Sequence, residues 1–114
     1  MRVLLIEDDA DVREVLQLSL EAGGQSISVA GSGAEGLALA ETLRPDIVLV
    51  DLKLPDLDGF EVARRLRERR GRDLRLVALT GFTRPVDREA TAAAGFDNHL
   101  TKPVDAGAIL ALLG

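Results

Sequence analysis

The stretch Asp46-Ile47-Val48-Leu49-Val50-Asp51 decides the fold of this chain. It is an apolar run rich in β-branched residues, it follows Pro45, and it begins and ends on a carboxylate. A continuous run of this kind predicts a strand that is buried on both faces, as in a parallel sheet. Ligands of open parallel sheets bind just past the carboxyl ends of the strands. Asp51, which stands where the run ends, is therefore the first candidate site residue.

Length and composition limit the class of protein. The 114 residues suffice for one domain, 1–114, with a single core. The net charge of −5 disfavours nucleic acid or an anionic membrane as a direct partner. Cysteine is absent, no apolar run approaches the roughly 18 residues that span a bilayer, and a strand pattern starting at Met1-Arg2-Val3 leaves no room for a signal peptide. We expect a cytoplasmic α/β domain without a membrane partner.

Hydrophobic patterns predict four further strands and five helices. The strands are expected at Arg2–Ile6, Ser26–Ala30, Leu74–Leu79 and Asn98–Thr101. The helices are expected at Ala10–Ala22, from the capping box Ser32–Glu35 to before Pro45, and at Phe60–Arg70, Pro85–Ala94 and Ala106–Leu113. This alternation implies right-handed crossovers and a doubly wound, five-stranded parallel sheet. The strand order 2-1-3-4-5, which is flavodoxin-like, fits best, with the period-two strand Ser26–Ala30 at an edge.

The first predicted helix carries apolar residues at helical spacing. They are Val12, Val15, Leu16 and Leu20, and Gly23-Gly24 are expected to end the helix.

Polar residues follow four of the predicted strands, and parallel strands bring them to one edge of the sheet. They are Glu7 and Asp8, then Asp51, Thr80 and Lys102. Crowded carboxylates repel one another by about 4 kcal/mol per close pair at an effective dielectric constant near 20. Mg²⁺ would relieve this repulsion and keep positions open for phosphate oxygen. With an ammonium group and a hydroxyl group beside it, the cluster predicts a phosphoryl-transfer site with Asp51 as the nucleophile.

At this point the residues resemble the receiver domains of two-component response regulators, over essentially the whole chain. The likeness lies in Glu7-Asp8, Asp51, Thr80-Gly81 and Lys102-Pro103, in that order on a repeated βα pattern. It implies that Asp51 accepts a phosphoryl group from a histidine kinase or a histidine phosphotransfer domain, in a reaction that needs Mg²⁺. The protein would be a signalling phosphoacceptor and not a turnover enzyme.

The resemblance also implies a role for each site residue. Asp8 would bind Mg²⁺ directly, Glu7 through water, and Lys53 through its backbone carbonyl, beside Asp51. Thr80 and Lys102 would hold the phosphoryl oxygens, and the Lys102-Pro103 bond would be cis. Movement of Thr80 and Lys102 would switch the face formed by the fourth helix, fifth strand and fifth helix, where a second copy or another part of a longer protein could bind.

Two positions depart from the family pattern. His99 stands three residues before Lys102, where the family usually carries Tyr or Phe. A histidine can still swing as the switch residue, although it is smaller and polar at both edges. The side chain of Lys53, and Phe82 two residues beyond Thr80, are expected at the mouth of the site, where they would alter the access of water.

Other features have structural interpretations. Asp9 is expected to cap the first helix, and the arginines from Arg64 to Arg75 are expected to form a solvated helix face. The last helix is apolar nearly all round. Either a partner or a second copy covers it, or the chain was cut from a longer protein such as a hybrid histidine kinase. The end of the chain at Gly114 favours the second explanation.

Two rival functions stay open. A flavodoxin-type cofactor carrier would need a Ser/Thr/Gly-rich phosphate cradle after the first strand, where Glu7-Asp8-Asp9 would repel a phosphate. An aspartyl phosphatase of the haloacid dehalogenase type normally has a second carboxylate two residues after its nucleophile, where this chain has Lys53.

Overall fold

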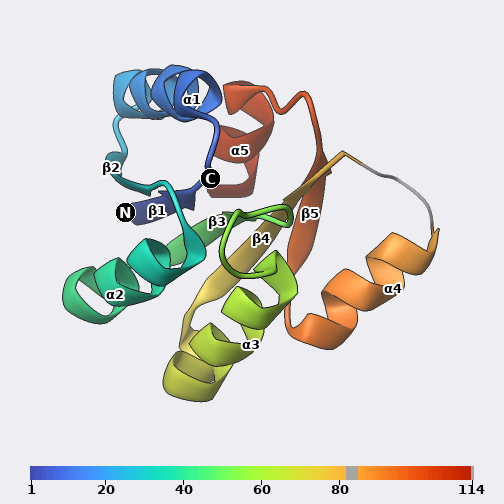
Figure 1. Cartoon of the computed structure of the whole chain (residues 1–114). Helices are drawn as coiled ribbons and strands as arrows, with labels where there is room; N and C mark the ends of the chain where they lie inside the picture. Colours follow the sequence, from blue (N-terminus) through green and yellow to red (C-terminus); the bar gives the residue numbers. More distant parts are fainter. Residues whose placement is uncertain (82–84, 114) are drawn as a thin grey trace.

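The computed structural model describes residues 1–81 and 85–113 and shows a twisted parallel sheet with helices on both faces (Figure 1). The strands are β1 (Arg2–Ile6), β2 (Ser26–Ala30), β3 (Ile47–Asp51), β4 (Arg75–Thr80) and β5 (Asn98–Thr101). Their order is β2-β1-β3-β4-β5, and every neighbouring pair is parallel. The predicted doubly wound, flavodoxin-like fold is confirmed, with β2 at an edge and β1 beside β3.

Two layers of helices enclose the sheet. The helices are α1 (Ala10–Ala22), α2 (Gly33–Leu43), α3 (Gly59–Arg70), α4 (Pro85–Ala94) and α5 (Ala106–Leu113). Helices α1 and α5 pack on one face of the sheet, and α2, α3 and α4 lie on the other (Figure 1). A short 3-10 turn over Gly71–Asp73, which the sequence patterns do not predict, follows α3.

Strand β3 is buried on both faces, as predicted. Residues Ile47 to Val50 have no exposed surface. Val48 and Val50 contact the α2 and α3 side, while Ile47 and Leu49 contact the α1 and α5 side. The strand begins at Ile47, and just before it the carboxylate of Asp46 accepts a hydrogen bond of 2.8 Å from the backbone N–H of Arg2.

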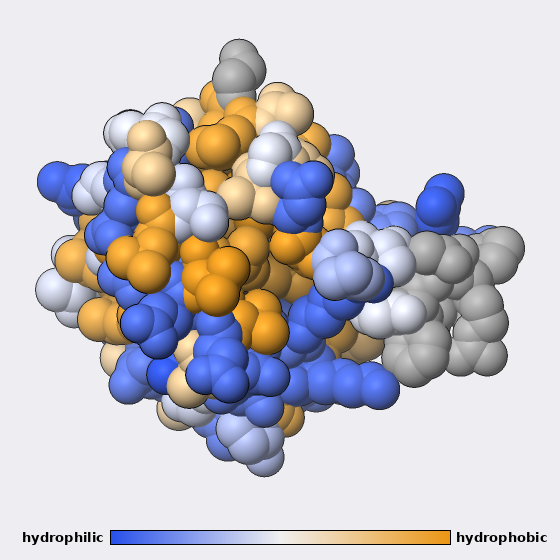
Figure 2. Space-filling model, turned by 90° about the horizontal axis from the view of Figure 1, so that it is seen from above, coloured by the Kyte–Doolittle hydropathy of each residue, from blue (hydrophilic) through white to orange (hydrophobic). Residues whose placement is uncertain are grey.

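Helix α1 has the predicted bounds, but only part of its apolar set is buried. Leu16 and Leu20 are buried, but Val12 and Val15 are 37% and 62% exposed. Each helical residue turns about 100° from the one before it, so Val15 lies well around the helix from the line through Leu16 and Leu20. Hydrophobic side chains gather on the surface seen from above in Figure 2, which looks down on the α1 and α5 layer. The exposed valines belong to this layer.

The arginine-rich face of α3 is also only partly solvated. Arg64 and Arg65 are exposed and pair with Glu61, as expected for a solvated face. The side chain of Arg67 is only 16% exposed, which corrects the expectation. It donates hydrogen bonds to the carbonyl oxygens of Gly71 (2.7 Å), Leu74 and Gly95 (2.8 Å), and to the Asp97 carboxylate (2.6 Å).

The last helix hides more of its apolar surface than its sequence suggests. Ile109 is buried, and Leu110, Leu112 and Leu113 are half-buried against the core on the α1 side. The exposed residues on α5 are small: Gly107, Ala108 and Ala111. In the part of the chain that the structure describes, no helix has both the length and the apolarity to cross a membrane.

Two leucines on α1 test this description of the core. Leu20→Ala should lower the free energy of unfolding by about 2–5 kcal/mol, because Leu20 has no exposed surface and its loss leaves a cavity. Leu18→Ala is the matched control: Leu18 is 60% exposed, and its loss should change stability by no more than about 0.5 kcal/mol. Urea denaturation measures both values. Equal losses in the two variants would contradict the orientation of α1.

Candidate functional site

The ends of β1 and β3 bring three carboxylates together. These strands are neighbours, with Ile6 paired to Val50, so Glu7 and Asp51 follow side by side. One carboxylate oxygen from each of Glu7, Asp8 and Asp51 lies within 4.8 Å of the others. Glu7 and Asp51 are buried and Asp8 is exposed. Two of the three acidic groups are therefore shielded from water, and all three lie close to one another.

The ends of β4 and β5 add the hydroxyl and the ammonium groups. Thr80 is paired with Thr101, and the backbone N–H of Lys102 donates to the Thr80 carbonyl at 2.7 Å. The Lys102 ammonium donates a hydrogen bond of 2.7 Å to Oδ2 of Asp51 and lies 3.0 Å from Oε1 of Glu7. The Lys102-Pro103 peptide bond is cis, as the resemblance implies.

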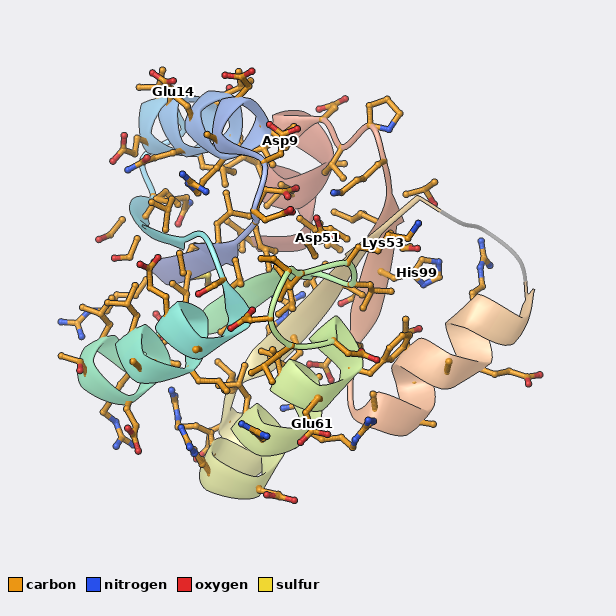
Figure 3. The ribbon with its side chains drawn as sticks, in the orientation of Figure 1. Asp9, Glu14, Asp51, Lys53, Glu61 and His99 are labelled. Carbon is orange, nitrogen blue, oxygen red and sulfur yellow. The ribbon has the colours of Figure 1, made fainter. Side chains whose placement is uncertain are left out.

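A cavity of about 530 Å³ opens at this edge of the sheet. Its wall includes Asp8, Asp51, Lys53, Thr80 and Lys102. Figure 3 shows Asp51 and Lys53 close together at this end of β3.

His99 is placed differently from the other predicted site residues. It is half-buried on β5, and its side chain lies on the α4 side of that strand (Figure 3). Among the described residues, His99 is not part of the cavity wall. Phe82 lies outside the described residues.

Several groups that hold the site in place have no clear signal in the sequence. The backbone N–H of Lys53 donates to Oδ1 of Asp51 at 2.9 Å, and the Arg13 guanidinium donates to the Glu7 carbonyl at 2.9 Å. Gly59, the first residue of α3, approaches the end of β3 closely: a Cβ there would lie 2.6 Å from the Asp51 carbonyl oxygen. Only glycine permits this approach. In the sequence, only the position of Gly59 in the polar turn after Asp51 indicates this role.

The pKa values of the two buried carboxyl groups, Glu7 and Asp51, are shifted in opposite directions. Burial, and then the hydrogen bond with Asp51, raise the pKa of Glu7 to about 7. Burial also acts to raise the pKa of Asp51, but hydrogen bonds with Glu7 and Lys102 outweigh it and hold that pKa below its usual range. For Lys102, burial acts to lower the pKa, while the bonds to Asp51 and Glu7 raise it. Asp51 is therefore the ionised member of the pair.

The chemistry of the cluster fits a hard divalent cation. Oε1 of Glu7 is fully buried and lies 3.0 Å from the Lys102 ammonium. One ammonium group cannot balance three carboxylates that lie within 4.8 Å of one another, so a further cation would reduce their repulsion. Carboxylate oxygens are the ligands that Mg²⁺ and Ca²⁺ prefer. Glu7, Asp8 and Asp51 can therefore hold such an ion.

The fold and the site define a doubly wound α/β protein with an acidic, lysine-bearing pocket at the carboxyl ends of its strands. The family model described as the response regulator receiver domain matches residues 3–114. The chain belongs to the response regulator receiver domain family, whose members serve in two-component systems.

Similar proteins agree with this assignment. The chain is 41% identical over 106 residues to an uncharacterized 14.6 kDa protein of Leptolyngbya boryana, covering 92% of this chain and 81% of that protein. It is 38% identical over 111 residues to the DNA-binding dual master transcriptional regulator RpaA of Synechocystis, covering 96% of this chain but only 46% of RpaA. The chemotaxis protein CheY4 of Vibrio cholerae has a similar structure, with a TM-score of 0.92, 27% identity and coverage of 98% and 94%.

The raised pKa of Glu7 predicts a pH-dependent stability. Between the ordinary pKa of 4.5 and about 7, the folded protein holds a proton on Glu7 that the unfolded chain has released. This contribution to stability is present below the ordinary pKa and is lost as the pH rises through 7. The free energy of unfolding of the metal-free protein should therefore fall by about 1–3 kcal/mol from about pH 5 to about pH 8.

Urea denaturation in the presence of a chelator, repeated across this pH range, measures the effect. Glu7→Gln cannot titrate, so its curve should be flatter than the wild-type curve by this amount. An unchanged slope in Glu7→Gln would show that Glu7 does not carry the extra proton.

Proposed function

We propose that residues 1–114 form one receiver domain in which Asp51 accepts a phosphoryl group from a histidine kinase or a histidine phosphotransfer domain, in a Mg²⁺-dependent reaction. One observation carries the proposal. The Lys102 ammonium lies 2.7 Å from Asp51, at the rim where the Glu7 and Asp8 carboxylates also meet. A nucleophile, a metal-binding cluster and a mobile cation are the parts that phosphoryl transfer needs.

The residues of the chain suit the separate tasks of this reaction. The lowered pKa of Asp51 keeps its carboxylate ionised, so that it can attack phosphorus. An O–P bond forms as the N–P bond of a phosphohistidine breaks, and the electron pair leaves with the imidazole of the donor. Bound Mg²⁺ would neutralise charge on the phosphoryl oxygens. Its ligands would be Asp51, Asp8, Glu7 through water, and the backbone carbonyl of Lys53.

Lys102 and Thr80 would hold the transferred group. The Lys102 ammonium pairs with the Asp51 carboxylate in this structure. After phosphorylation of Asp51 the negative charge would lie on the phosphoryl oxygens, and the ammonium can move outward to pair with them. Thr80 is buried in the same cavity wall and offers a hydroxyl donor. Phosphorylation adds about −1.5 to −2 charge at neutral pH, which gives both side chains a new, stronger acceptor.

The same two residues connect the site to an output face, which we define as α4, β5 and α5. Thr80 ends β4 ahead of α4, and Lys102 follows β5 ahead of α5. Helix α4 is weakly anchored: from Arg88 to Ala94, only Thr91 and Ala94 are buried. Movement of Thr80 would therefore shift α4, with His99 as the switch residue between β5 and α4. A second copy or another part of a longer protein would bind this face.

Turnover chemistry has less support. Lys53 lines the cavity at the position where a haloacid dehalogenase-type phosphatase normally places its second carboxylate. The acidic residues at the end of β1 disfavour the phosphate of a flavin cofactor. A stoichiometric phosphoryl adduct is expected instead of repeated hydrolysis.

Acetyl phosphate provides a direct test. With Mg²⁺, intact mass spectrometry should show the mass increment of one phosphoryl group, and a chelator should abolish it. Asp51→Asn should lose the increment because its amide cannot act as the nucleophile. Asp46→Asn makes the same chemical change at the other end of β3, beyond the site, and should keep the increment.

Three results would contradict the proposal. An adduct on Asp51→Asn as large as on the wild type would place the acceptor elsewhere. Release of many equivalents of phosphate per chain from a phosphate ester would favour the phosphatase. A purified protein coloured by bound flavin would support the rival function of a flavodoxin-type cofactor carrier.

A further inference from the structure

The loop between β3 and α3 is fixed at the residue that would supply the backbone metal ligand. Lys53 forms an isolated antiparallel bridge with Asp58, and its N–H donates to Asp51. Asp58 in turn caps α3 by accepting from the N–H of Phe60 at 2.6 Å. These contacts all lie within the loop or at its two ends. They do not attach the middle of the loop to the rest of the fold.

Asp56 makes that attachment. Its Oδ1 accepts from the N–H of Gly33 at 2.8 Å, and its Oδ2 accepts from the N–H of Ala34 at 2.9 Å. Gly33 and Ala34 are the first residues of α2, so one carboxylate binds the positive end of that helix with both oxygens. The hydrogen bonds from Ala34 and Gly33 lower the pKa of Asp56, which stays ionised near neutral pH.

A second contact joins the same two segments. Leu57 packs on Gly33 so closely that a Cβ there would lie 2.9 Å from Cβ of Leu57. Helix α2 also has a cap of its own, because Oγ of Ser32 accepts from the N–H of Glu35 at 3.2 Å. The end of α2 therefore carries two different caps. Ser32 stabilises the helix alone, while Asp56 stabilises the helix and also holds the loop.

We propose that Asp56 is a positioning residue for metal binding: by tying the loop to α2, it fixes the backbone of Lys53 for its role as a ligand. This inference rests on the proposed function. A loop released from α2 would sample more conformations, and the bound ion would have to order it again. Groups that orient metal ligands without touching the metal commonly affect affinity in this way.

A titration with MgCl₂ tests the inference without any phosphorylation. Isothermal titration calorimetry measures the affinity, and the NMR shift of the Leu54 amide, which shares a peptide group with the Lys53 carbonyl, reports the ligand position. Asp56→Ala should bind Mg²⁺ about tenfold more weakly than the wild type, as expected for loss of a ligand-orienting group. Asp56→Asn keeps one acceptor oxygen and should fall between the two, which covers the case in which Asp56→Ala folds poorly.

Ser32→Ala is the matched control. It removes the other cap of the same helix end but leaves the loop attached, so it should bind Mg²⁺ like the wild type even if α2 is destabilised. Wild-type affinity in both Asp56 variants, or an equal loss in Ser32→Ala, would overturn the inference alone. If the wild-type chain itself binds no Mg²⁺, the proposed function fails and the inference fails with it.

Discussion

The site depends on one ammonium group placed between two buried carboxylates. Removing Glu7 and Asp51 from water is expensive, and their mutual repulsion adds to the cost. The Lys102 ammonium, 2.7 Å from one and 3.0 Å from the other, and the proton favoured on Glu7 make the arrangement tolerable. This contact requires β1, β3 and β5 to end at the same edge of the sheet. The parallel topology is therefore a precondition for the chemistry.

The parts of this structure that could be predicted from the sequence follow from simple geometric rules. A strand that is apolar on both faces, as from Ile47 to Val50, has to lie inside a parallel sheet. Once the strand order is known, the rim residues must converge. This is why Glu7, Asp51 and Lys102 could be grouped although they are far apart in the chain.

The features that could not be predicted are side-chain contacts with residues that are distant in the sequence. Helical spacing shows that α1 has an apolar stripe, but it cannot show how wide the sheet-facing strip is, and Val15 falls outside it. The run of arginines gives no sign that Arg67 would turn inward toward four backbone and side-chain acceptors. Asp56 reads as one more acidic loop residue, because nothing local indicates that its partner is a helix more than twenty residues earlier.

The inward turn of Arg67 bears on how α4 can move. The Arg67 guanidinium donates hydrogen bonds to Gly95 and Asp97, just after α4, and to Gly71, just after α3. It therefore connects the two segments. The C-terminal end of α4 is therefore fixed by hydrogen bonds, while from Arg88 to Ala94 only Thr91 and Ala94 are buried. A displacement of α4 would therefore be smallest beside Gly95 and larger toward the end that follows Thr80.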